Sequence, residues 1–332
     1  MGLPRRRAED PDALIEGIAG GSRRALARAI THVENDTATG RAVLAGLYAR
    51  TGGAHTVGVT GSAGVGKSTL VSALAREQRA RGRRVAIVAV DPSSPFSQGA
   101  ILGDRIRMQD LTLDEGVFLR SMAARGNLGG LSETATGVVD VMDAAGYDVV
   151  LLETVGAGQD EVEVATATQT TVLVTAPASG DDVQAMKAGL MEIAQVMVVN
   201  KADIAGADTA VQQLRGLLSI APPRPWTPPI VKTVARSREG VGELVDAIDQ
   251  HQQHLRDSGH AEEARRELAR AQIVALARAS LHREALATAE QEGILGELTE
   301  EVAGRRRDPR AAAESLLKAV HTRWQQGGAE GI

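Results

Sequence analysis

The 332-residue sequence contains no cysteine. Disulfide bonds, zinc sites with cysteine ligands and catalysis by a thiol are therefore excluded. A chain without thiols is compatible with a reducing compartment, so we expect a cytoplasmic protein.

Aromatic residues are also scarce, at 2% of the chain, whereas hydrophobic residues as a whole make up 43%. The core must therefore be built from Ala, Val, Leu and Ile. A basic surplus is absent too, because the formal net charge is −5. Proteins that bind nucleic acid usually carry a basic face, and we expect no such partner. No stretch approaches the roughly 20 apolar residues that cross a bilayer, so we expect no membrane association.

Between His55 and about Ile248, short apolar runs alternate with helical patterns. Several runs are continuous in Val, Ile and Leu, as in strands buried on both faces of a parallel sheet. The alternation predicts a mostly parallel, doubly wound α/β sheet with helices on both faces. The predicted strands are Thr56–Thr60, Val85–Val90, Val117–Arg120, Val149–Glu153, Thr171–Ala176, Val196–Asn200 and Ile230–Thr233.

Helical patterns flank this region on both sides. Residues 12–50 predict two helices separated at Gly20-Gly21, with Ser22 capping the second. From about Leu255 to Trp324 the chain is polar, Ala-rich and helical, with Ile273, Leu276 and Leu281 on one face. This segment is either an appendage packed on the central domain or a dimerisation arm. The proline-rich stretch 222–229 predicts a surface loop.

Residues 61–68, GSAGVGKS, match the pattern G-x-x-x-x-G-K-[ST] between an apolar strand and a helical pattern. That placement predicts a phosphate-binding loop, or P-loop. Its glycines let successive N–H groups face an anion, and the following helix adds its positive dipole end. Lys67 would hold the β/γ-phosphates and Ser68 would ligate Mg²⁺. The predicted nucleotide contacts are Gly61, Ser62, Ala63, Gly64, Val65, Gly66, Lys67, Ser68 and Thr69.

The pattern N-K-x-D occurs at residues 200–203, at the end of a predicted buried strand. Asp203 can accept hydrogen bonds from N1–H and the 2-amino group of guanine. Adenine lacks that pair of donors and would leave a carboxylate unpaired, which costs about 1 to 3 kcal/mol. Asn200 can bond the purine edge and tie this loop to the P-loop, and the Lys201 stem can lie over the base. The pattern therefore predicts GTP and GDP as ligands.

The segment after the last predicted strand, Val234-Ala235-Arg236, falls where a third base-contacting loop is expected. The N–H of Ala235 could bond the guanine carbonyl oxygen. Because a main-chain group would do this, the side chains are weakly constrained.

Acidic residues at strand ends predict a Mg²⁺ site and the hydrolytic centre. Glu153 ends a buried strand, and Gly156 beyond it would let an N–H approach the γ-phosphate. Asp91 and Asp104 are candidates for the Mg²⁺ shell or for activating water, with a helix cap and a turn residue as the alternatives. Gln159 stays unassigned. The predicted catalytic residues are Lys67, Asp91, Asp104 and Glu153, and the predicted metal ligands are Ser68, Asp91, Asp104 and Glu153.

Together these segments resemble the methylmalonyl-CoA mutase-associated GTPases of the MeaB/ArgK type. The matching strings are GVTGSAGVGKSTL, VAVDPSSPFSQGAILGDRIRM, RSMAARGNLGGL, LLETVGAGQDEVEVA, GDDVQAMKAGLMEIA and VVNKAD. The resemblance covers most of the chain. Two departures are Val234, where serine is common, and the stretch SPFSQGA, which leaves the choice of partner open.

This resemblance implies a GTP-hydrolysing chaperone of an adenosylcobalamin-dependent acyl-CoA mutase, which gates cofactor loading and protects or reactivates the mutase. It implies a homodimer joined through helical arms. It places the positions of Asp91, Asp104 and Glu153 at the Mg²⁺/γ-phosphate site and that of Lys187 in a further switch loop. The implied divisions are an arm at 1–54, a P-loop GTPase domain at 55–250 and a dimerisation arm at 251–332.

Two alternatives remain open. A metal-insertion GTPase would need a metal-binding loop, and the chain has no cysteine. His251 and His254 could bind a metal but are better explained as residues of a solvated polar helix. A P-loop small-molecule kinase or transport ATPase is disfavoured by N-K-x-D. We also expect slow intrinsic hydrolysis, because neither an arginine finger nor an adjacent Gln is evident. Arg105 and Arg107 could contribute, or the partner could supply the missing group.

Overall fold

The computed structural model describes residues 9–92, 109–124, 130–154, 164–165, 167–177, 188–257, 259 and 261–327. The chain forms two compact units, Met1–Gln272 and Ile273–Ile332. The first contains the sheet and the second contains only helices among its described residues.

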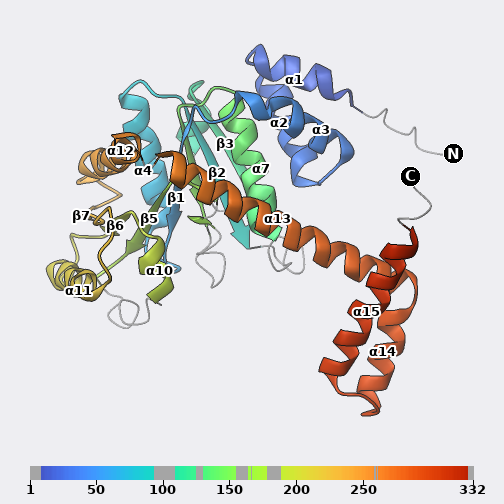
Figure 1. Ribbon diagram of the computed structural model, residues 1–332. Coiled ribbons are helices and arrows are strands. Elements are labelled where there is room, and N and C mark those ends of the chain that lie inside the picture. The colour runs from blue at the N-terminus through green and yellow to red at the C-terminus, as the bar shows by residue number, and fades with distance from the viewer. Residues whose placement is uncertain are drawn as a thin grey trace. The chain divides into compact units, whose positions relative to one another are not determined.

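Seven parallel strands form one sheet in the order β3-β2-β4-β1-β5-β6-β7 (Figure 1). Each predicted strand begins within one residue of an observed strand, which confirms the parallel α/β fold. The strands are β1 His55–Thr60, β2 Val85–Pro92, β3 Val117–Ala124, β4 Val149–Glu153, β5 Thr170–Thr175, β6 Val196–Val199 and β7 Ile230–Lys232.

The central strands are buried on both faces, because every residue of β1, β4, β5 and β6 is buried. Alternate residues face opposite sides, as the pleat requires. On one side, Val57 and Leu151 pack against the helices α4 (Lys67–Ala80) and α12 (Val241–Asp257). On the other side, Leu152 packs against α7 (Gly130–Ala144). The largest fully buried side chains are all Ile, Leu or Met, as the scarcity of aromatics predicts.

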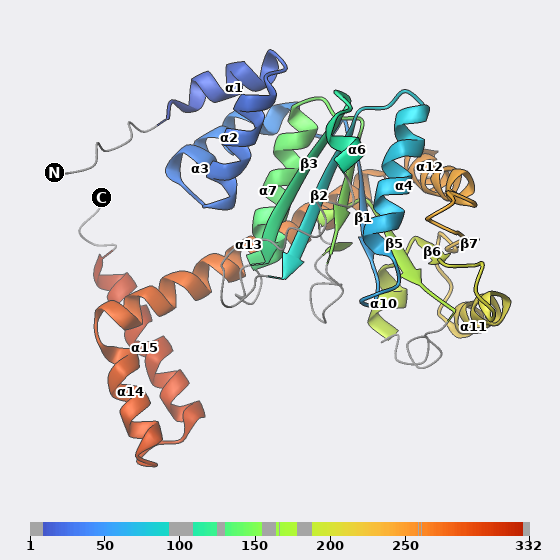
Figure 2. The same cartoon turned by 180° about the vertical axis from the view of Figure 1, so that it is seen from behind.

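The same side as α7 is covered at β5 and β6 by two further helices, α10 (Ala188–Ile193) and α11 (Ala207–Ile220). The short helix α6 (Gln109–Thr112) lies beside α4, as Figure 2 shows from behind. The proline-rich stretch between α11 and β7 has no helix or strand, which confirms the predicted loop.

The N-terminal arm consists of α1 (Pro11–Ala19), α2 (Arg23–Glu34) and α3 (Ala38–Leu47), followed by a 3-10 turn, η1 (Tyr48–Arg50). The predicted break falls between α1 and α2, and Ser22 Oγ accepts from the N–H of Ala25 at 3.2 Å. Apolar residues of α2, among them Leu26 and Ile30, share a core with α7.

One carboxylate on α7 positions the segment that enters β1. Asp143 is 8% exposed. Its Oδ1 accepts from the N–H groups of Gly53 at 3.1 Å and Ala54 at 2.8 Å. The start of β1, the strand that leads into the P-loop, is thus fixed to α7, which packs on the sheet.

The second unit holds the end of α13 (Ala261–Gln291), together with α14 (Ile294–Ala303) and α15 (Pro309–Gly327). Its apolar centre is small and consists of Ala285, Ala289 and Val320, with Leu295 and Leu316 against them. Within the described ranges, no helix combines the length and the apolarity needed to span a membrane.

Candidate functional site

The P-loop runs from the end of β1 to the first turn of α4. Two of its positions require glycine for two reasons. The backbone has positive φ there, and neighbouring atoms lie too close to leave room for a Cβ. Gly61 has φ +140°, and a Cβ there would lie 2.1 Å from the carbonyl oxygen of Val174. Gly66 has φ +97°, and its Cβ would lie 2.6 Å from the side-chain nitrogen of Asn200. A side chain at either position would displace the loop or its neighbour.

Lys67 is the first residue of α4 and is 5% exposed. Its Nζ donates to the carbonyl oxygens of Gly61 at 2.7 Å and Ser62 at 2.9 Å. The ammonium group is therefore held inside the curl of the loop, at a helix N-terminus whose N–H groups favour an anion.

Ser68 meets an acidic residue from the neighbouring strand. β4 pairs with β1 in parallel, with Glu153 opposite Val59. Glu153 is 5% exposed, and its Oε1 accepts from Ser68 Oγ at 2.6 Å. A hydroxyl and a carboxylate are hard oxygen donors of the kind that Mg²⁺ binds, so this pair fits the predicted metal.

Asn200 joins three loops at this edge of the sheet and is 2% exposed. Its Nδ2 donates to the carbonyl oxygen of Val65 in the P-loop at 2.8 Å. Its Oδ1 accepts from Thr233 Oγ1 and from the N–H of Ala235, both at 3.1 Å. The predicted tie between the N-K-x-D segment and the P-loop is therefore present.

The other members of the N-K-x-D segment lie nearer solvent. Lys201 has φ +57°, and its Nζ donates to the carbonyl oxygen of Gly64 at 2.8 Å. Asp203 is exposed. Val234 pairs with Glu239 across a tight loop, and Arg236 on that loop is exposed.

The order of the strands explains why these residues meet. From β1 the chain moves outward to β2 and β3, returns to β4, and then crosses to β5 on the other side of β1. The carboxyl ends of β1, β4 and β6 supply the P-loop, Glu153 and Asn200. Ligands of open α/β sheets bind at this edge, where the strand order reverses.

Several predicted residues lie outside the described residues: Asp104, Gly156, Gln159 and Lys187. Asp91 lies in β2, beside β4 at the same edge, and only its backbone is described.

The interpretation of His251 as a solvated residue is wrong. Its side chain is 4% exposed, because α12 packs on the sheet, and its Nδ1 lies 2.8 Å from Thr170 Oγ1. The same hydroxyl lies 2.8 Å from Nε2 of the buried His55. Burial lowers the pKa of His251 to about 4 and that of His55 to about 3. No group of three or more potential metal-binding His, Cys, Asp or Glu side chains occurs in the part of the chain that the structure describes.

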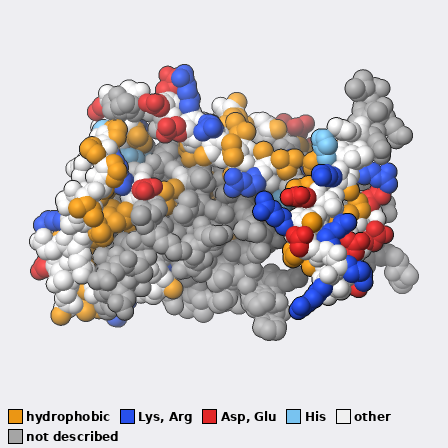
Figure 3. All heavy atoms as spheres, turned by 60° about the horizontal axis from the view of Figure 1, so that its bottom comes forward, with side chains coloured by type: hydrophobic (Ala, Val, Ile, Leu, Met, Phe, Trp, Pro, Cys, Tyr) orange, Lys and Arg blue, Asp and Glu red, His pale blue; other side chains and the backbone are white. Residues whose placement is uncertain are grey.

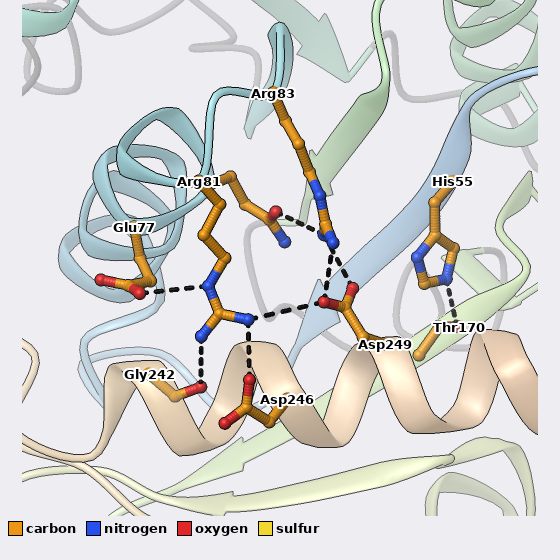
Figure 4. A network of polar contacts seen from close by, with 9 residues as sticks. His55, Glu77, Arg81, Arg83, Thr170, Gly242, Asp246 and Asp249 are labelled. Atoms are coloured by element: carbon orange, nitrogen blue, oxygen red, sulfur yellow. Dashed lines mark hydrogen bonds and ion pairs between the residues drawn. The ribbon is translucent and has the colours of Figure 1, made fainter.

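Sequence reasoning also missed a cluster of ion pairs that joins the P-loop helix region to α12 (Figure 4). Arg83 donates to both oxygens of Asp249, at 2.7 and 2.8 Å. Arg81 donates to Asp246 at 2.7 Å and to the carbonyl oxygen of Gly242 at 3.1 Å. The only sequence signal was the basic run after α4, and its partners are more than 150 residues away, as the separations of 165 and 166 show.

A family model described as "Methylmalonyl Co-A mutase-associated GTPase MeaB" matches residues 26–290. The chain belongs to the MeaB family. This MeaB-family protein is 44% identical to a putative GTPase of Pyrococcus abyssi over 313 residues, which cover 93% of the chain and 96% of that protein. It is 36% identical to GTPase ArgK of Escherichia coli, with 76% of the chain and 79% of ArgK covered.

A third relative is the mouse protein named methylmalonic aciduria type A homolog, mitochondrial, at 34% identity, with 78% of the chain and 67% of that protein covered. Among solved structures, one titled LAO/AO transport system kinase superposes with a TM-score of 0.70 at 26% identity. The superposition covers 96% of this chain and 100% of the chain in that structure. The MeaB-family chain is thus a nucleotide-binding P-loop GTPase.

Proposed function

We propose that this GTPase is a chaperone of an adenosylcobalamin-dependent acyl-CoA mutase of the methylmalonyl-CoA mutase type. It uses GTP to gate cofactor loading and to protect or reactivate the mutase. The observation that carries this proposal is the match of residues 26–290 to a mutase-associated GTPase family. The name of the mouse relative, methylmalonic aciduria type A homolog, supports the same partner.

In this proposal each loop at the carboxyl edge of the sheet contacts a different part of the nucleotide. The P-loop amides of residues 61–69 and the Lys67 ammonium hold the β- and γ-phosphates, since both lie at the N-terminus of α4. Asp203 selects guanine, and Lys201 and the Val234–Arg236 loop complete the base site. Asn200 positions the base site relative to the phosphate site, because it bonds Val65 and Ala235 at once.

Ser68 and Glu153 would hold Mg²⁺, with Asp91 and Asp104 as further candidate ligands or water-activating groups. Bound Mg²⁺ would supply charge neutralisation on the phosphates. The 2.6 Å contact between Ser68 and Glu153 supports this assignment, because it brings two suitable donors to one point. Gly156 and Lys187 complete the proposed γ-phosphate and switch contacts.

We also propose that the helical arms, residues 1–54 and 251–332 around a GTPase domain at 55–250, join two copies into a homodimer. The second unit exposes large apolar side chains, with Ile273 at 65%, Leu281 at 55% and Leu317 at 60%. Charged side chains of both signs are intermixed with hydrophobic ones on this unit (Figure 3). Large exposed apolar side chains rimmed by polar residues mark association surfaces where they form a contiguous patch.

The alternatives have weaker support. A metal-insertion GTPase would need a metal-binding cluster, and none lies within the described ranges. A kinase or transport ATPase would use ATP. The N-K-x-D segment, with Asp203 as the proposed guanine ligand, favours GTP instead. GTP and ATP titrations distinguish these classes, since an ATPase would bind ATP more tightly.

The test is capture of partners from a native extract by the tagged protein loaded with a non-hydrolysable GTP analogue, with GDP, or with no nucleotide. We expect a cobalamin-dependent mutase to be captured, in amounts that differ between the two nucleotide states. Cofactor loading of that mutase, followed by cobalamin absorbance, should then respond to GTP. A mutase missing from every sample, or a loading rate indifferent to GTP, contradicts the proposal.

A further inference from the structure

A cavity of about 550 Å³ opens beside the P-loop. Its lining carries several positive charges, whereas the base and ribose of a nucleotide are uncharged. The cavity is lined by Ser68, Thr69, Ser72, Ala73, Arg76, Ala235, Arg236 and Arg238. The lining combines one face of α4, where residues 68, 72 and 76 are spaced by one helical turn, with the loop after β7. Three of its eight residues are arginines, and none is acidic.

The position of the cavity identifies the part of the nucleotide that faces it. Ser68 and Thr69 begin α4, where the phosphates bind, and Ala235 belongs to the loop assigned to the base. A ribose links phosphate and base in every nucleotide. A nucleotide held at both ends would therefore turn its ribose toward this cavity and its arginines.

The loop presents two of these arginines in a fixed geometry. Val234 N–H donates to Glu239 O at 3.0 Å, and Ser237 N–H donates to Val234 O at 3.1 Å. Arg238 has φ +65°, a conformation that costs an arginine about 1 kcal/mol. Among the described residues, no carboxylate pairs with Arg236 or Arg238.

The third arginine can be released for a ligand. Arg76 pairs with Asp110 at 3.2 Å, and the Asp110 side chain is 81% exposed. An exposed ion pair of this kind contributes little, so a phosphate can replace Asp110 without a large cost. Arginine forms paired hydrogen bonds with phosphate oxygens.

We propose that this cavity binds phosphate groups carried on the ribose of a guanine nucleotide, in addition to those at the 5′ position. Such a ligand, phosphorylated at both 5′ and 3′ oxygens, would occupy the P-loop and the arginine cavity at once. It would compete with GTP for the P-loop, and the protein with this ligand bound could not bind GTP. The inference rests on nucleotide binding at the P-loop and is independent of the mutase partner.

The test compares the Kd of GDP with that of guanosine 5′-diphosphate 3′-diphosphate by calorimetry, in wild type and in the double variant Arg76→Gln/Arg238→Asn. Asn tolerates positive φ, so the loop should keep its shape. The wild type should bind the 3′-phosphorylated nucleotide about tenfold more tightly than GDP, as two charge-assisted contacts allow. In the double variant the two Kd values should become equal, with that of GDP unchanged.

Arg215→Gln is the matched control, because it removes an exposed arginine of α11 outside the cavity. It should keep the tenfold difference. Equal affinities in wild type, or a difference that survives in the double variant, overturns the inference while leaving GDP binding intact. Failure of GDP itself to bind overturns the nucleotide site together with this inference.

Discussion

Lys67 and Asn200 show how single side chains connect the loops of this site. Both are almost fully buried, and both bond main-chain carbonyl groups of the P-loop. A buried polar group that loses its partner costs about 1 to 3 kcal/mol. Changes at these positions therefore act on the shape of the loop as well as on ligand contacts.

Replacing Lys67 by alanine should abolish GTP turnover. The substitution removes the cation proposed to hold the β/γ-phosphates, the one that donates to the carbonyl oxygens of Gly61 and Ser62. Phosphate release under single-turnover conditions measures the loss, with circular dichroism to show that the fold persists. Turnover at the wild-type rate would remove the argument for the phosphate site.

Asp203→Asn should weaken the preference for guanine. An amide can accept only one of the two hydrogen bonds from the base and offers a donor instead. The expected change is a fall of at least about tenfold in GDP affinity, with xanthosine diphosphate now bound better. Competition with a fluorescent nucleotide gives both values, and unchanged discrimination would count against the role of Asp203.

His251 should make the protein less stable as the pH falls from 7 to 5. Burial lowers its pKa from 6.5 to about 4, so in this range the unfolded chain takes up a proton that the folded chain does not. That difference lowers the free energy of unfolding by about 2 kcal/mol over the two pH units. Urea unfolding at both pH values should show a smaller loss in His251→Gln than in wild type. Equal losses would contradict the burial argument.

At the scale of elements, ion pairs tie the segment that follows α4 to α12. The bidentate pair of Arg83 and Asp249, with Arg81 beside it, holds the segment after α4 against α12. The carboxylate is 26% exposed, so solvent screens the pair only in part. The P-loop helix is thereby fixed at the end opposite its phosphate site.

Asp249→Ala should lower the free energy of unfolding by about 1 to 2 kcal/mol, because two charge-assisted hydrogen bonds are lost. Asp208→Ala is the matched control, since it removes a carboxylate that is 89% exposed and pairs with Lys232 at 3.1 Å. It should cost less than about 0.5 kcal/mol. Denaturant titration of both variants checks the difference, and equal costs would contradict it.

At the scale of the whole molecule, the second unit has only a small apolar core of its own. Its core consists of Ala285, Ala289 and Val320 with Leu295 and Leu316 against them, whereas Ile273, Leu281 and Leu317 are exposed. Burial of these exposed side chains against a second copy would stabilise the unit by about 25 cal/mol for each Å² of apolar surface removed from water.

In the proposed homodimer these surfaces are buried, so the double variant Leu281→Glu/Leu317→Glu should be monomeric and the wild type should associate. Charges placed on a buried apolar interface are strongly unfavourable. Sedimentation equilibrium measures the mass. Leu113→Glu, at a position 86% exposed in the first unit, is the control and should stay dimeric. A wild-type monomer, or a dimer that survives both substitutions, rejects the proposed interface.

The sequence by itself determined the strands, the P-loop and the N-K-x-D segment. These features are local, since the apolar runs of β1 and β4 and the glycines of residues 61–66 impose their conformations on a few adjacent residues. Only the tertiary structure decided which side chains meet. The burial of His251, the hub at Asn200, the pairing of Arg83 with Asp249 and the arginine cavity join residues far apart in the chain. Such contacts depend on strand order and helix packing, which a short sequence pattern does not specify.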